Sequence, residues 1–78
     1  MDDKIKRIMS AVFGVEVEGI TDKASPQILE QWDSLNHMKL VVALEDEFEI
    51  QFDDTEILEM QSLALIKLIA SKKGVEIR

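Results

Sequence analysis

The chain has 78 residues, of which 46% are hydrophobic and 32% charged, and its formal net charge is −7. So short a chain leaves little room to enclose a complete enzyme pocket, and we expect one domain over residues 1–78. The acidic balance argues against nucleic acid as a partner, because phosphate binding needs a cationic surface. The sequence contains no cysteine, which excludes disulfides and zinc–cysteine sites.

The hydropathy pattern argues against membrane insertion. The longest apolar run, at residues 40–44, is too short to cross a bilayer. The first residues also lack the basic, apolar and small-residue segments of a secretory signal. We therefore expect a cytoplasmic monomer without a membrane span.

The first predicted helix runs from about Asp3 to Phe13, and Gly14 is its expected stop. Five apolar residues in it recur at the spacing of one helical face: Ile5, Ile8, Met9, Val12 and Phe13. A long connection rich in turn-forming residues follows over residues 15–33. Four apolar side chains are expected to fix this loop to the core: Ile20, Ile28, Leu29 and Trp32.

The second predicted helix begins at Asp33 or Ser34, both good N-terminal residues, and ends near Glu49. Its apolar stripe is too wide for a helix that packs on one neighbour, so we expect this helix to be central. The stripe consists of Leu35, Met38, Leu40, Val41, Val42, Leu44 and Phe48.

Two shorter helices complete the predicted fold. A third helix near Asp54 to Glu59 should turn three apolar side chains inward: Ile57, Leu58 and Met60. Ser62 should cap a fourth helix that ends near Lys72, before Gly74, with Leu63, Ile66, Ile69 and Ala70 buried. The predicted fold is all-α: a four-helix bundle with a long first loop and a short third helix.

Negative charge and a hydroxyl come together at the middle of the chain. Residues 33–59 contain nine acidic residues and one basic residue, Lys39. Ser34 lies at the expected start of a helix, where unpaired N–H groups and the helix dipole would stabilise a phosphate ester. The alternative is that Asp33 and Ser34 only cap the helix and that the acids form a solvated face.

Asp33-Ser34-Leu35 near mid-chain, in an acidic chain of this length and helix spacing, resembles the acyl carrier protein family over nearly the whole chain. The resemblance implies that a phosphopantetheinyl transferase, with magnesium and coenzyme A, attaches 4′-phosphopantetheine to Ser34, between Asp33 and Leu35. The thiol of that arm would hold acyl intermediates as thioesters for fatty acid or specialised biosynthesis. The chain would then be a carrier and not an enzyme.

The same resemblance implies a docking surface for acyl-loading and acyl-processing enzymes with basic patches. Its expected residues are Leu35, Met38, Glu45, Asp46, Asp54 and Glu56. Opposed charges would speed the encounter and orient the partners. Some apolar residues between the second and third helices could shelter an acyl chain, although each is more simply explained as core: Leu44, Phe48, Ile57 and Met60.

Several positions depart from the family pattern. Common fatty-acid-synthesis members carry acids in the turns after the serine, whereas this chain has Asn36, His37 and Lys39. Trp32 is also bulkier than the small residue usual before the tripeptide. These departures favour a carrier dedicated to one specialised pathway.

Three other functions fit the sequence less well. An esterase could use Ser34 with His37 as base, but no glycine-flanked nucleophile turn surrounds this serine. A calcium site could use Asp53, Asp54, Glu56 and Glu59, but the segment lacks the alternating ligands and central glycine of a calcium loop, and we predict no metal site. The strongest alternative is a small acidic helical interaction module without a prosthetic group, which leaves Ser34 unexplained.

Overall fold

The computed structural model describes residues 2–74, with side chains from Lys4 onward, so residues 75–78 of the predicted domain lie outside the described part. Its elements are α1 (Asp2–Phe13), the 3-10 helix η1 (Val17–Gly19), α2 (Ser34–Phe48), α3 (Asp54–Glu59) and α4 (Leu63–Lys72). The described residues form no strand, and the all-α prediction is confirmed. The predicted bounds of the third and fourth helices match the structure, and those of the first and second differ by one residue. Sequence analysis did not predict η1.

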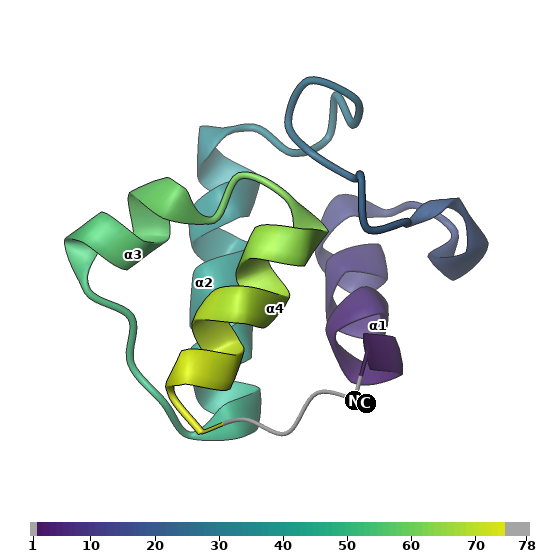
Figure 1. The fold of residues 1–78 in the computed structure, drawn as a ribbon. Helices are drawn as coiled ribbons and strands as arrows, with labels where there is room; N and C mark the ends of the chain where they lie inside the picture. The colour runs from purple at the N-terminus through teal and green to yellow at the C-terminus, as the bar shows by residue number, and fades with distance from the viewer. Residues whose placement is uncertain (1, 75–78) are drawn as a thin grey trace.

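The helices are arranged around α2. In Figure 1, α1 stands on one side of α2, α3 lies on the other side, and α4 crosses in front. The long loop from Gly14 to Asp33 passes over the N-terminal end of α2. This arrangement brings the start of α2, α3 and the loop together at one end of the molecule.

The core is one cluster of apolar side chains. α1 contributes every fourth residue, Ile5, Met9 and Phe13, and the loop contributes Ile20, Ala24 and Trp32. α2 buries Leu40, Val41 and Leu44, and α4 buries Leu63, Ile66, Ile69 and Ala70. The predicted buried face of the fourth helix is therefore confirmed. α3 has no fully buried residue, and Met60 enters the core just after it.

Local chemistry fixes most helix ends. Gly14 and Gly74 adopt φ values of 71° and 92°, in the left-handed region where glycine is favoured, and stop α1 and α4 as predicted. Ser62 caps α4 by accepting a hydrogen bond from the Leu65 N–H at 3.1 Å. At the start of α3, Asp53 and Glu56 form a reciprocal capping box, with bonds of 2.8 and 2.9 Å.

Two apolar residues expected inside are on the surface. Leu58 is 74% exposed and Ile28 is 64% exposed. In the six-residue helix α3, Ile57 packs partly buried against the core, and Leu58, about 100° further round the helix, points to solvent. Ile28 lies in the loop segment above α2, where Trp32 and Ala24 are the buried anchors.

The apolar stripe of α2 divides into two faces. Leu40, Val41 and Leu44 are buried, whereas three residues predicted to belong to the same stripe are largely exposed: Leu35, Met38 and Val42. The stripe is wide because a surface ridge runs beside the core-facing one.

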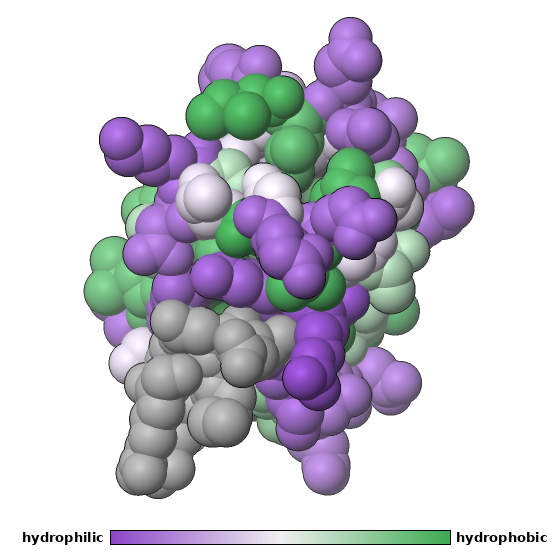
Figure 2. Space-filling view, turned by 90° about the vertical axis from the view of Figure 1, so that its right-hand side faces the viewer, coloured by the Kyte–Doolittle hydropathy of each residue, from purple (hydrophilic) through white to green (hydrophobic). Residues whose placement is uncertain are grey.

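On the side of the molecule that carries α1, Figure 2 shows a mainly hydrophilic surface with scattered apolar residues. No helix within residues 2–74 has the length and apolar character needed to cross a membrane.

Candidate functional site

Ser34 is the first residue of α2, and its side chain is exposed. The capping role falls to Asp33, whose Oδ1 accepts a hydrogen bond from the Asn36 N–H at 2.8 Å. Within residues 2–74, no side-chain hydrogen bond engages the Ser34 hydroxyl. The alternative in which Asp33 and Ser34 both serve as helix caps therefore holds for Asp33 but not for Ser34.

A surface pocket of about 350 Å³ opens beside Ser34. The loop lines it with Pro26 and Trp32, and α3 lines it with Ile57 and Leu58. The first turns of α2 complete the wall. The exposed hydroxyl thus lies at the edge of a small, mostly apolar concavity, which is a common arrangement for a ligand site.

The inner wall of this pocket contains a short hydrogen-bond chain. The Trp32 Nε1–H donates to His37 Nδ1 at 2.9 Å, and His37 Nε2 lies 2.8 Å from the Ile57 carbonyl oxygen. The Trp32 and His37 rings are stacked, with centroids 6.2 Å apart. Trp32 in turn contacts Phe13 of α1, with ring centroids 5.2 Å apart. The His37 ring is half-buried and hydrogen-bonded through both nitrogens.

The exposed ridge of α2 is the main apolar surface near Ser34. Leu35, Met38 and Val42 follow the i, i+3, i+7 spacing of one helical face, and Asp46 extends it by one turn. The sequence prediction included Val42 in the wide apolar stripe of this helix without dividing the stripe into buried and exposed parts. Val42 follows Leu35 at i+7 and so lies on the same helical face, whereas Leu40 and Leu44 lie on the opposite, buried face. This spacing is the signal that assigns Val42 to the surface.

The acids expected to contact partners fall into two groups. The Glu45 carboxylate accepts the Phe52 N–H at 2.8 Å and so holds the turn between α2 and α3. Glu56 belongs to the capping box and pairs with Lys73 at 2.8 Å. The hydrogen bond from Lys73, followed by that from the Asp53 N–H, lowers the pKa of Glu56 below its usual value. Asp46 and Asp54 are exposed.

The other proposed chemistries find little support in this geometry. Both ring nitrogens of His37 are engaged by Trp32 and Ile57, so neither is directed at Ser34 as a base. The carboxylates of Asp53 and Glu56 are used in capping α3. Residues 2–74 bring together no group of three or more side chains that could hold a metal ion.

Comparison with known proteins shows the family of the chain. Residues 3–68 match the family model described as the phosphopantetheine attachment site. The chain is also 32% identical, over 63 residues, to the acyl carrier protein of Buchnera aphidicola subsp. Schizaphis graminum, covering 81% of this chain and 80% of the relative. The chain belongs to the acyl carrier protein family.

The solved structures include a similar acyl carrier protein. The solution structure of the holo acyl carrier protein of Geobacter metallireducens aligns with a TM-score of 0.73 and 27% identity, over 99% of this chain and 94% of the other. Acyl carrier proteins are carriers rather than enzymes, and their family model is defined by covalently attached phosphopantetheine. An exposed hydroxyl at a helix start, beside a small pocket, fits such a group.

Proposed function

We propose that Ser34 is the residue that carries 4′-phosphopantetheine and that the loaded arm delivers acyl groups to enzymes of fatty acid or specialised biosynthesis. The observation that carries this proposal is the division of roles at the start of α2. Asp33 supplies the helix cap, and the Ser34 hydroxyl stays exposed and unengaged within residues 2–74.

The position of Ser34 suits the attachment chemistry. Its oxygen would form a phosphoester bond with the phosphate that bears the pantetheine arm as the pyrophosphate bond of coenzyme A breaks. The 3′,5′-adenosine diphosphate half would leave, and the hydroxyl proton would pass to a base of the transferase. The helix N-terminus would then lie next to the negative phosphate, where the dipole is favourable. The pocket bounded by Pro26, Ile57 and Leu58 offers apolar surface within reach of what the arm carries.

The docking surface is proposed to centre on the exposed ridge of α2. Leu35, Met38 and Val42 supply apolar contact next to Ser34, and Asp46 and Asp54 supply charge for a basic partner. Glu45 and Glu56 contribute negative potential, but their carboxylates also hold the turn and α3. The partners are the phosphopantetheinyl transferase and the acyl-loading and acyl-processing enzymes.

The proposal also covers the domain organisation, oligomeric state, location and pathway of the carrier. One continuous core cluster supports a single carrier domain that acts as a monomer, and we place it in the cytoplasm. The departures at Trp32 and His37, which are joined by a hydrogen bond, support service in one specialised pathway.

The test is intact-mass analysis after incubation with coenzyme A, magnesium and a broad phosphopantetheinyl transferase. Wild type should gain one arm, Ser34→Ala none, and Ser71→Ala, which alters an exposed serine of α4, one arm as in wild type. Added salt should slow the transfer, because it screens the attraction between the acidic surface and the enzyme. An arm on Ser34→Ala, or none on wild type, would overturn the proposal and favour an interaction module.

A further inference from the structure

His37 joins α2 to α3 through a hydrogen bond whose direction the structure determines. An indole N–H can only donate, so His37 Nδ1 must accept the bond from Trp32. A neutral imidazole that accepts on Nδ1 carries its proton on Nε2. The Nε2–H therefore donates to the Ile57 carbonyl oxygen, 2.8 Å away.

That bond matters because α3 has few other attachments. The helix has six residues and none is fully buried. Its start is held by the capping box of Asp53 and by the Glu56–Lys73 ion pair. The bond from His37 reaches the Ile57 carbonyl near the end of α3, which otherwise accepts only a long bond of 3.4 Å from the Met60 N–H among the described residues. It therefore fixes the end of α3 nearest the start of α2.

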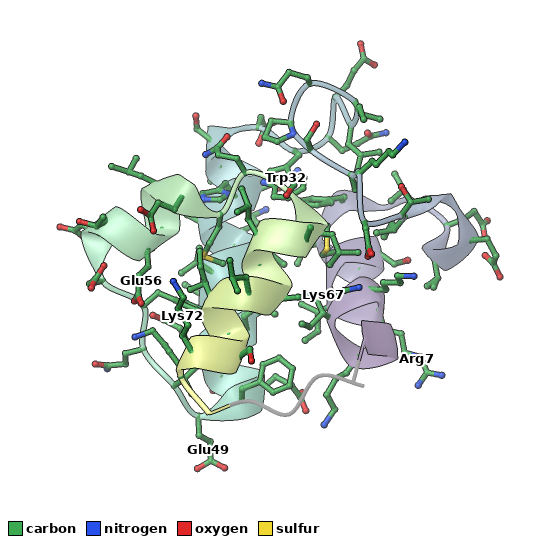
Figure 3. All side chains as sticks on the ribbon, viewed as in Figure 1. Arg7, Trp32, Glu49, Glu56, Lys67 and Lys72 are labelled. Carbon is green, nitrogen blue, oxygen red and sulfur yellow. The ribbon has the colours of Figure 1, made fainter. Side chains whose placement is uncertain are left out.

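The same pair of rings separates the pocket from the core. Trp32 is 3% exposed and touches Phe13 of α1 on its inner side, while Trp32 and His37 both line the pocket on their outer side. Figure 3 shows Trp32 at the N-terminal end of α2, beneath the long loop. The fully buried Leu44 and Met60 do not line this pocket.

We propose that the hydrogen-bonded Trp32–His37 pair is a barrier that keeps the group carried on Ser34 in the surface pocket and out of the helical core. The pocket, at about 350 Å³, lies near the lower end of the range for ligand pockets. Short acyl groups would therefore be sheltered in the pocket, whereas longer chains would remain exposed to solvent. This inference rests on the proposed attachment of the arm to Ser34, and His37 acts in it as a positioning residue.

The test loads the protein with arms that bear acetyl, butyryl, hexanoyl or decanoyl thioesters and records methyl NMR spectra. In wild type, the acyl groups should shift the methyl signals of Met38, Ile57 and Leu58 and leave those of Leu44 and Met60 in place. His37→Phe keeps a ring but removes both hydrogen-bonding atoms, so the decanoyl chain should then shift the two core methyls. Cleavage of that thioester by hydroxylamine should also slow several-fold relative to wild type.

Matched variants separate the hydrogen bond from simple packing. His37→Gln keeps an N–H donor for the Ile57 carbonyl and should restore the wild-type pattern. Trp32→Phe removes the indole donor and should reproduce the effect of His37→Phe, which keeps the test valid if one variant does not fold. Lys39→Gln, at an exposed position on α2, should behave as wild type.

Two results would overturn the barrier. One is a decanoyl chain that shifts the core methyls in wild type, and the other is a pair of ring variants that match wild type in both measurements. Failure to attach any arm would overturn the Ser34 proposal, and this inference with it. The mass spectrum reports arm attachment before any NMR spectrum is recorded, so the two failures are distinguishable.

Discussion

α3 and α4 are both short helices next to α2, but they are held by different forces. α4 buries four residues in the core: Leu63, Ile66, Ile69 and Ala70. α3 buries none fully: Ile57 packs only partly against the core, and polar contacts with Asp53, Lys73 and His37 help to hold the helix. Burial of apolar surface is the larger stabilising term, whereas exposed polar contacts contribute little each. α4 is therefore fixed by its buried face, whereas α3 is held in place by only a few contacts.

The difference matters for function because α3, and not α4, borders the pocket beside Ser34. Segments with few buried apolar contacts open locally at low free-energy cost. α3 should therefore open more readily than α4. In Figure 3, Glu56 projects from α3 toward the C-terminal end of α4, where Lys72 is labelled. The side of α3 that faces this end of α4 is therefore polar.

The largest effect should come from breaking the attachment of α4. Ile66→Ala removes a fully buried side chain and should lower the free energy of unfolding by about 2–5 kcal/mol. Leu68→Ala, in the same helix but 52% exposed, should change it by less than about 0.5 kcal/mol. Urea unfolding followed by circular dichroism measures both. Equal losses in the two variants would show that α4 is not held by its buried face.

An intermediate effect should come from the cap of α3. Asp53→Ala removes the side chain that accepts from the Glu56 N–H, and a lost cap costs about 0.5–2 kcal/mol. The loss should be local, so amide hydrogen exchange should quicken in α3 and stay unchanged in α1 and α4. Asp54→Ala, at the exposed neighbouring position, is the control and should change exchange far less. Faster exchange across the whole chain would contradict the local attachment of α3.

The smallest effect should come from the Glu56–Lys73 pair and should depend on pH. Lys73 lowers the pKa of Glu56 in the folded state, so the carboxylate stabilises the fold above its ordinary pKa. That contribution is lost as the pH falls through the lowered pKa. Glu56→Gln keeps a capping-box side chain but removes the charge. The variant should therefore be slightly less stable than wild type at neutral pH, and the two should converge in acid.

Thermal unfolding from about pH 7 to about pH 3 measures this convergence. Glu59→Gln removes a different exposed acid from α3 and controls for the general loss of negative charge. A gap between Glu56→Gln and wild type that stays constant with pH would show that the ion pair does not stabilise α3.

The sequence predicts the fold well because its main signals are local. Helical spacing, the turn glycines Gly14 and Gly74, and the caps Asp53 and Ser62 each act within a few residues, and they define all four helices. The errors concern which side chains of a helix face the core and which face solvent. Leu58 and Val42 are apolar residues on helices, and only the packing of α3 and the split face of α2 reveal that they are exposed.

The site could be predicted in part. The position of Ser34 at a helix start follows from local capping preferences, but the sequence does not show that Asp33 alone provides the cap. The contact of His37 with Ile57 joins residues twenty positions apart, and that pairing depends on how α3 packs on α2. Likewise, the use of Glu45 to hold the Phe52 N–H becomes visible only when the turn is built.

The assignment of the α2 cap to Asp33 has one more consequence. On the proposed attachment, a group added to the oxygen of Ser34 would leave the bond between Asp33 and the Asn36 N–H in place, because the Ser34 hydroxyl takes no part in that bond. The helix would then keep its first turn whether the neighbouring oxygen is bare or esterified. The proposed arm could therefore be attached and removed without any partial melting of the central helix.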